Sequence, residues 1–154
     1  AAAEAAYVAM SGRLGEGDYV LEEMDRQPDT VELIVGARRD GSFGPVVLVG
    51  LGGVQAELYR DGQVALAPVD DDEARRMIEA LRAYPLLDGW RGRPAVDVAA
   101  AARVVAAVSR LLADDPDLVE CEINPLRVGP EGAVAVDALV LAADHTIETS
   151  GDDA

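Results

Sequence analysis

The sequence predicts an α+β domain, in which a mostly antiparallel sheet carries two main helices packed on one face. Three observations lead to this prediction. The 154 residues are 50% hydrophobic, which is enough for one domain with a real core. Several short β-branched segments are separated by glycine-containing turns, as in antiparallel sheets. Two longer segments, 70–82 and 97–113, have instead the apolar spacing of amphipathic helices.

The chain opens with a predicted helix and a predicted strand. Residues 1–10 are rich in alanine and favour a helix, which the three glycines within 11–17 should end. Residues 19–24 are a strand candidate. Residues 25–29 form a polar connection to the strand that follows.

Residues 31–39 alternate in the manner of a half-buried strand. Val31, Leu33 and Val35 should share one face, with Glu32 on the other. Burying a carboxylate without a partner is costly, so the residues alone favour an exposed strand face for Glu32.

Further strands are predicted over residues 45–49, 54–59 and 63–68. The first of them leads into Gly50-Leu-Gly-Gly53, where glycines allow close backbone approach and present N–H groups to phosphate oxygens. A tight turn is the alternative explanation of these glycines. Asp61-Gly62 is a strong hairpin signal.

Both main helices have a recognisable start. Asp70 and Glu73 have the spacing of a capping box, and Asp97 can cap the second helix. The expected buried stripes are Ala74, Met77, Ile78 and Leu81 in the first helix, and Ala101, Val105, Val108 and Leu112 in the second.

A loop over residues 86–94 joins the two helices and carries Arg91 and Arg93. Guanidinium groups bind phosphoryl or carboxylate oxygens in pairs, so these arginines are candidate phosphoryl contacts. Ion pairs within an acidic protein would explain them nearly as well.

Two apolar strands, 120–126 and 135–138, close the domain around a turn over 127–132. Asn124 leaves the first strand and Asp137 the second, so strand pairing would bring an amide oxygen and a carboxylate together. Such a pair suits Mg²⁺, which takes few protein oxygens and completes its shell with water and nucleotide phosphates. A β-hairpin with ordinary turn chemistry is the alternative that the spacing leaves open.

Five segments in series resemble one family. The resemblance covers roughly residues 19–141 and points to the C-terminal part of the ATP-grasp domain in NDP-forming acyl-CoA synthetases, the acetate–CoA ligase (ADP-forming) group, with succinyl-CoA synthetase β-subunits as more distant relatives. The segments are Val31-Glu-Leu-Ile-Val-Gly36, Ser42-Phe-Gly-Pro-Val-Val47, Gly50-Leu-Gly-Gly53, residues 84–94, and Glu122-Ile-Asn-Pro-Leu126 followed by Val136-Asp-Ala138.

The resemblance implies a complete enzyme that interconverts acyl-CoA, ADP and phosphate with free acid, CoA and ATP, through acyl phosphate and phosphohistidine. Its cofactors would be ATP or ADP with Mg²⁺. Its partner would be a CoA-binding domain or subunit of the same enzyme, in a homo- or hetero-oligomer. The expected contacts are Glu22, Glu23, Met24 and Glu32 for the nucleoside, Gly52, Gly53, Arg91 and Arg93 for phosphoryl groups, and Asn124 and Asp137 for the metal.

Three features depart from the family pattern. All thirteen basic residues are arginine, whereas ATP-grasp enzymes hold phosphates with lysines from their nucleotide-binding half. Leu139 stands where the family usually has a basic residue, which would weaken this copy or make it non-catalytic. The connection at residues 25–29 is also longer than the usual link, which affects the expected nucleotide contacts.

We therefore interpret residues 1–142 as the C-terminal portion of an ATP-grasp domain. Residues 1–18 would remain from an upstream helix and loop, and 143–154 would be an acidic, disordered tail. The chain alone should then show no ligase turnover. The alternatives are a non-catalytic regulatory module of an acetyltransferase fusion, and a degenerate fragment that pairs with a partner subunit.

Composition argues against several other classes. A net charge of −16 repels nucleic acid. No apolar run approaches the roughly 20 residues that span a bilayer, so no membrane partner is expected. A single cysteine, Cys121, allows no internal disulfide and fits the cytoplasm. We expect that thiol to be buried and inert, and we assign no catalytic role to His145.

Overall fold

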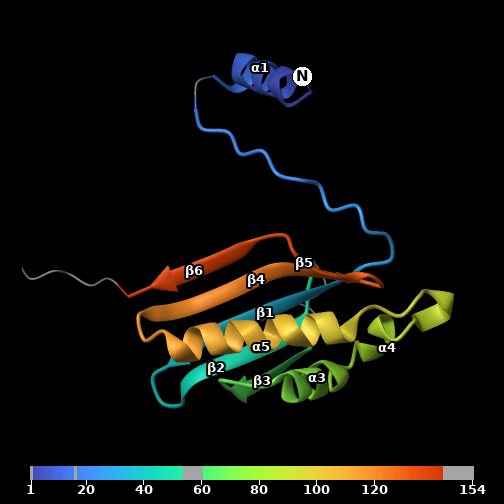
Figure 1. Cartoon of the computed structure of the whole chain (residues 1–154), viewed down its shortest axis with the longest axis vertical. Helices are drawn as coiled ribbons and strands as arrows, with labels where there is room; N and C mark the ends of the chain where they lie inside the picture. Colours follow the sequence, from blue (N-terminus) through green and yellow to red (C-terminus); the bar gives the residue numbers. More distant parts are fainter. Residues whose placement is uncertain (1, 16, 54–60, 144–154) are drawn as a thin grey trace, which may run out of the picture.

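A six-stranded antiparallel sheet forms the centre of the computed structural model, which describes residues 2–15, 17–53 and 61–143. The order across the sheet is β3-β2-β1-β4-β5, and β6 pairs with the same strand, β4, as β5 does (Figure 1). The strands are β1 Val31–Asp40, β2 Gly44–Leu51, β3 Gly62–Leu66, β4 Leu118–Gly129, β5 Gly132–Ala135 and β6 Ala138–Ala142.

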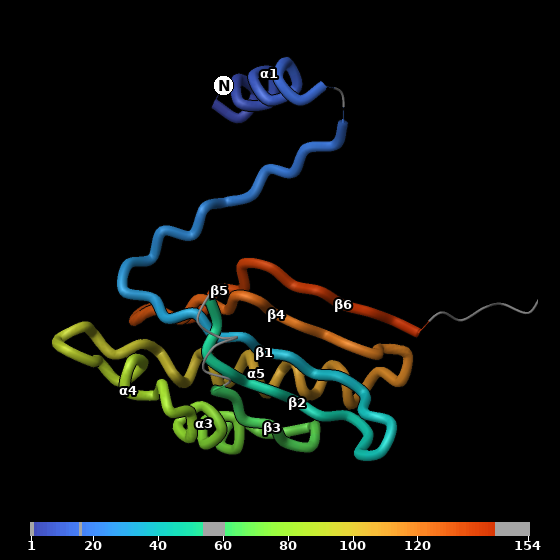
Figure 2. The backbone as a smooth tube through the Cα atoms, turned by 180° about the vertical axis from the view of Figure 1, so that it is seen from behind, coloured from blue at the N-terminus to red at the C-terminus, as the bar shows by residue number. Residues whose placement is uncertain are grey.

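The helices gather on one face of this sheet. The long helix α5 crosses β1, β2, β4 and β5, while α3 packs against α5 and the β2–β3 edge. Figure 2 shows the sheet from its other, uncovered face. The predicted α+β architecture with two main helices on one face is confirmed. The helices are α1 Ala2–Leu14, α3 Asp71–Glu79, α4 Tyr84–Leu87, the 3₁₀ turn η1 Trp90–Gly92, and α5 Val98–Asp114.

Local sequence explains where the two main helices begin. The Asp70 carboxylate accepts a hydrogen bond from the Glu73 N–H at 2.7 Å, and the Asp97 carboxylate accepts one from the Ala100 N–H at 2.9 Å. Each bond satisfies one of the unpaired N–H groups at a helix start. Both predicted apolar stripes are buried.

The core lies between the helices and the covered face of the sheet. In β1 the side chains of Val31, Leu33 and Val35 are buried and Glu32 is exposed, as the alternation predicted. The one fully buried polar side chain in the described residues, Ser109, bonds to the Ala106 carbonyl at 2.8 Å and accepts from the Val69 N–H at 3.1 Å. The buried Ser109 hydroxyl is therefore satisfied.

Three local predictions near the helices and the first strand were wrong. Residues 19–24 form no strand, because an alternating segment needs a neighbouring strand edge and none in the described chain pairs with it. Helix α1 runs on to Leu14 instead of ending near Met10. The loop predicted over 86–94 contains η1 and the last residues of α4, where Leu87 is buried in the core.

The closing hairpin also differs from its prediction. Strand β4 continues to Gly129, so the turn consists of Pro130 and Glu131 alone. The returning strand is divided into β5 and β6, because Val136 and Asp137 leave the regular ladder opposite a bulge in β4.

No helix in the described residues is both long and apolar enough to cross a membrane. The strand predicted over 54–59, His145, and all but the first residue of the predicted tail lie outside the described residues.

Candidate functional site

The two predicted metal ligands lie opposite one another on the closing hairpin. Ile123 pairs with Ala138 and Leu126 with Ala135, so the register sets Asn124 across from Asp137. The Asn124 N–H donates to the Asp137 carbonyl at 3.2 Å. Because Asp137 lies between β5 and β6, outside the regular ladder, this backbone hydrogen bond is the contact that sets Asp137 beside Asn124.

Both side chains are exposed and only partly satisfied. The Asn124 amide Nδ2 donates to Glu122 Oε1 at 3.3 Å, and Asp137 Oδ1 accepts from the Ala138 N–H at 2.8 Å. Within the described residues, Asn124 Oδ1 and Asp137 Oδ2 have no protein donor, and Asp137 forms no ion pair. Two hard oxygens are thus left facing solvent at one point of the hairpin.

Glu32 and the two predicted glycines come together beside the strand end of β2. The Gly52 N–H donates to the Glu32 carbonyl at 2.8 Å. A Cβ at Gly52 would lie 3.0–3.1 Å from the backbone of Glu32 and Leu33, so only glycine fits there without a shift. Gly53 has a φ of 75°, and a Cβ there would lie 3.1 Å from Glu32 Oε2.

This contact changes the predicted role of Gly52. Its N–H is already bonded, so it is not free for a phosphate oxygen as the glycine run suggested. The Gly53 N–H is the remaining candidate, and it lies next to the exposed Glu32 carboxylate.

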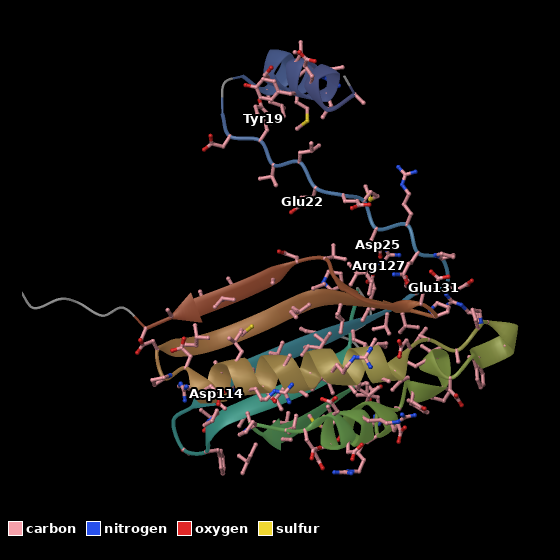
Figure 3. The ribbon with its side chains drawn as sticks, viewed as in Figure 1. Tyr19, Glu22, Asp25, Asp114, Arg127 and Glu131 are labelled. Carbon is pink, nitrogen blue, oxygen red and sulfur yellow. The ribbon has the colours of Figure 1, made fainter. Side chains whose placement is uncertain are left out.

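The predicted nucleoside contacts Glu22, Glu23 and Met24 lie on an extended connection outside the sheet, and all three are exposed. Figure 3 shows Glu22 on the part of this connection that stands away from the strands, whereas Asp25 reaches Arg127. Glu23 and Met24 share a surface hollow with Val134 of β5.

Arg91 and Arg93 point to different neighbours. The Arg93 Nε lies 3.6 Å from Asp29 Oδ1, a distance typical of a loose ion pair. The Arg91 guanidinium lies 5.9 Å from the centre of the Trp90 ring, in reach of a cation–π contact. Arg91 has a φ of 55°, which is unusual for a residue with a side chain. Both arginines are exposed.

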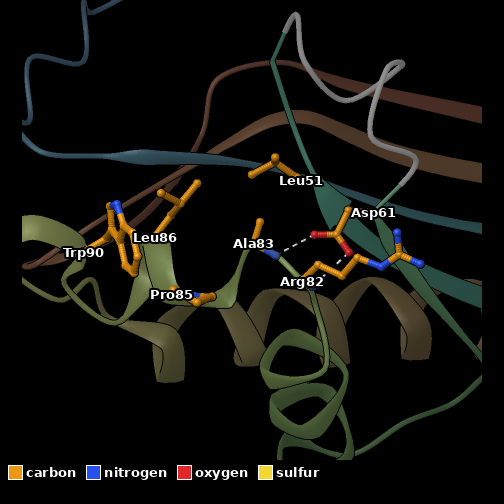
Figure 4. A pocket seen from close by; sticks show the side chains of 7 residues that line it. All are labelled: Leu51, Asp61, Arg82, Ala83, Pro85, Leu86 and Trp90. Carbon is orange, nitrogen blue, oxygen red and sulfur yellow. Dashed lines mark hydrogen bonds between the residues drawn. The ribbon is translucent and has the colours of Figure 1, made fainter.

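Sequence reasoning missed an apolar cavity of about 420 Å³ beside the end of β2 (Figure 4). The Asp61 carboxylate forms part of its wall and accepts from the N–H groups of Arg82 and Ala83, at 2.9 and 2.7 Å. Asp61 was interpreted as a hairpin-turn residue, and no local pattern indicates that it holds the chain after α3. The other side chains that line the cavity belong to Leu51, Pro85, Leu86 and Trp90.

Comparison with known proteins identifies the family of the chain. The sequence profile of the ATP-grasp domain matches residues 2–141, which is most of the chain. The chain belongs to the ATP-grasp domain family. The segments that suggested this family in the sequence, from the first β-strand to the closing hairpin, all lie within that match.

The ATP-grasp chain has relatives among acyl-CoA-forming enzymes. The subunit beta of acetate–CoA ligase (ADP-forming) I from Pyrococcus furiosus is 39% identical over 110 residues, covering 71% of this chain and 47% of that subunit. Trans-feruloyl-CoA synthase from an unknown prokaryotic organism is 42% identical over 112 residues, covering 71% of this chain and 16% of that protein. The chain thus spans less than half the length of either relative.

Solved structures show the same fold. The apo form of dinucleotide-forming acetyl-coenzyme A synthetase 1 from Ca. Korarchaeum cryptofilum matches with a TM-score of 0.78 and 35% identity, over 92% of this chain and 66% of that one. The same enzyme in complex with coenzyme A and Mg-AMPPCP matches with a TM-score of 0.70 and 39% identity, over 73% and 53%. The predicted family and fold are therefore confirmed.

Proposed function

We propose that this chain is the nucleotide- and Mg²⁺-binding part of an ADP-forming acyl-CoA synthetase, which interconverts acyl-CoA, ADP and phosphate with a carboxylic acid, CoA and ATP. The observation that carries the proposal is the pair Asn124 and Asp137, directly opposed on an exposed hairpin and each with an oxygen left open. The relative from Ca. Korarchaeum cryptofilum, described in complex with Mg-AMPPCP and coenzyme A, supports the same assignment.

The donor set fits Mg²⁺. An amide oxygen and a carboxylate are hard ligands, and two protein oxygens leave most of an octahedral shell for water and phosphate. With only one formal negative charge between them, the two side chains should bind the bare ion weakly and the nucleotide complex better. When bound, Mg²⁺ neutralises phosphate oxygens and lowers the cost of charge developing during phosphoryl transfer.

The other residues of the chain have separate tasks in this proposal. Glu32 accepts hydrogen bonds from ribose hydroxyls, and the segment from Glu22 to Met24 contacts the nucleoside. The Gly53 N–H donates to a phosphate oxygen, close to the turn where Gly52 permits the tight approach of β2 and β1. Arg91 and Arg93 are the phosphoryl-contact candidates, and both lie exposed with only loose partners. A CoA-binding domain or subunit, in an oligomeric enzyme, supplies the remaining reaction groups.

A non-catalytic module is the second candidate, and one residue favours it. Leu139 lies on β6 opposite Glu122, is 50% exposed, and provides no cation beside the proposed metal pair. If this position limits phosphoryl transfer, Leu139→Lys should raise the turnover of the complete enzyme. An inactive wild-type enzyme that still binds nucleotide, with no gain in Leu139→Lys, would favour the regulatory module.

The test of the proposed function uses the complete protein that carries this chain. Asp137→Asn should lower acyl-CoA-dependent ATP formation by roughly a hundredfold or more while the midpoint of thermal unfolding stays nearly unchanged. Asp88→Asn removes an exposed carboxylate elsewhere and serves as the matched control, with full activity expected. Equal activity of Asp137→Asn and the wild type would refute the metal assignment.

A further inference from the structure

One arginine, Arg127 of β4, binds the extended connection (residues 25–30) that leads from the N-terminal segment into the sheet. Arg127 Nη1 donates to Asp25 Oδ2 at 2.7 Å and to the Asp25 carbonyl at 3.0 Å. Its Nη2 donates to Thr30 Oγ1 at 2.9 Å and to the Gln27 carbonyl at 3.2 Å. The two charged side chains are only 22% and 15% exposed, compared with 40% or more in the ion pairs Arg75–Glu79, Arg76–Glu73 and Arg93–Asp29.

The connection also packs closely against the backbone of β4. Gly129 follows Arg127 by two residues, so both lie on the same face of the strand. A Cβ at Gly129 would collide with Gln27 Oε1 and lie 3.2 Å from Thr30 Cγ2. The Gln27 N–H in turn donates to Asp25 Oδ1 at 3.1 Å. Hydrogen bonds and shape thus hold residues 25–30 in one place on β4.

Arg127 also lies between the two halves of the proposed site. It pairs with Glu32 in the register of β1 and β4, and it follows Asn124 by three residues along β4. On its other side it pairs with Val134, which borders the hollow shared with Glu23 and Met24. The Arg127 side chain thus contacts the connection that follows the nucleoside segment, as Figure 3 shows for Asp25, while its backbone belongs to the strand that carries Asn124.

We propose that Arg127 is a positioning residue for nucleotide binding: its contacts with Asp25, Gln27 and Thr30 hold the nucleoside segment in register with the metal hairpin. This inference rests on the proposed function, because it assigns the nucleoside to residues 22–24 and the metal to Asn124 and Asp137. The planar guanidinium is required, since it serves four acceptors through two nitrogens. An ammonium group is compact and cannot replace it at a fork-shaped site.

The test is calorimetric titration of Mg-ADP into the complete protein. Arg127→Met should weaken binding roughly tenfold, because a charged group loses several hydrogen bonds that hold the segment. Asp25→Asn leaves β4 unchanged and should cause a loss of similar size. The double variant should be little worse than either one, because both act through the same contact.

Two further variants separate positioning from other roles. Arg127→Lys keeps the positive charge opposite Glu32 and should bind Mg-ADP as weakly as Arg127→Met. Arg110→Met removes an exposed arginine from α5, on the covered side of the sheet, and should bind like the wild type. Hydrogen exchange should become faster at residues 25–30 in Arg127→Met and stay slow in α5, which shows that the variant is folded.

Three results would overturn the inference while leaving the proposed function intact. They are wild-type affinity in both Arg127→Met and Asp25→Asn, losses that add in the double variant, and recovery of affinity in Arg127→Lys. A merely structural ion pair would give the first result, with lower stability but unchanged affinity in the folded protein. A wild-type protein that binds no Mg-ADP refutes the proposed function itself, and the positioning role with it.

Discussion

The two faces of the sheet hold distant parts of the chain together in different ways. On the covered face, Arg39 of β1 donates to the carbonyls of Leu112, Asp115 and Leu118 at 2.5–2.8 Å and so closes the C-terminal end of α5. On the open face, Arg127 of β4 holds the irregular connection before β1. Arg39 therefore joins a helix to the sheet within the packed core layer. Arg127 instead holds an extended segment that belongs to no helix or strand.

This contrast predicts that stability and ligand binding can be separated by face. The largest fully buried side chains, such as Leu33, Leu112 and Leu126, all point to the covered face. The proposed ligand groups Glu32, Asn124 and Asp137 are all exposed, and Glu32 lies on the face of β1 opposite to the buried Leu33. Changes on the covered face should therefore alter unfolding, and changes on the open face should alter binding.

The largest effect is expected in the core. Leu112→Ala should lower the free energy of unfolding by about 2–5 kcal/mol, because it removes a fully buried side chain and leaves a cavity. Leu111→Ala changes the neighbouring residue, which is 46% exposed, and should cost much less. Urea unfolding of both variants measures the difference, and equal losses would show that the burial assigned to α5 is wrong.

The second prediction compares neighbouring arginines on opposite faces. Arg39→Met should lower the free energy of unfolding by about 2 kcal/mol, since three carbonyls lose a charged donor. The affinity of the folded protein for Mg-ADP should not change. Arg38→Met is the matched control and should leave stability nearly unchanged, because Arg38 is exposed. A loss of Mg-ADP affinity in Arg39→Met would contradict the prediction that changes on the covered face alter only unfolding.

The sequence predicts the covered face better than the open one, for a physical reason. Helix starts at Asp70 and Asp97 depend on a cap three residues away, and the buried stripes depend on periodicity within one segment. Both signals are local, so the starts of α3 and α5 were predicted to within one residue, whereas α3 ends at Glu79 and not at Arg82 as predicted. The alternation of β1 is equally local and was also confirmed.

The open face depends on contacts between distant residues. Arg127 and Asp25 are 102 positions apart, and nothing in either segment identifies the partner. The hydrogen bond that occupies the Gly52 N–H, and the bulge that divides β5 from β6, arise in the same way from the pairing of strands. The opposition of Asn124 and Asp137 could be anticipated because a short hairpin keeps both within one local unit. Metal binding by that pair stays a prediction.

The third prediction concerns binding on the open face. Glu32→Ala should weaken Mg-ADP binding by about 1–3 kcal/mol, the range for losing a hydrogen bond to a charged group. Stability should change by no more than about 0.5 kcal/mol, because the side chain is exposed. Glu131→Ala removes a carboxylate from the β4–β5 turn and is the control. Calorimetric titration that gives the same affinity for Glu32→Ala and wild type would remove Glu32 from the site.

The last prediction concerns the chemical reactivity of the buried Cys121 thiol, where the smallest effect is expected. Burial raises the pKa of Cys121, so at a mildly alkaline pH less thiolate is present in the folded protein than in the unfolded chain. Iodoacetamide should therefore modify the native protein more slowly than the protein in urea, and mass spectrometry can follow both reactions. Equal rates would show that Cys121 is accessible, contrary to its place in the core.

We propose that one metal–nucleotide complex binds between Asn124 and Asp137. Mn²⁺ with ADP, added to the isotope-labelled protein, should broaden amide signals around both residues and at Glu32 and Gly53, because a paramagnetic ion relaxes nearby nuclei. Asp137→Asn should lose this pattern and keep only the broadening caused by weak binding to the acidic surface. The same pattern in wild type and Asp137→Asn, or broadening centred on the acidic start of α3, would contradict the claim.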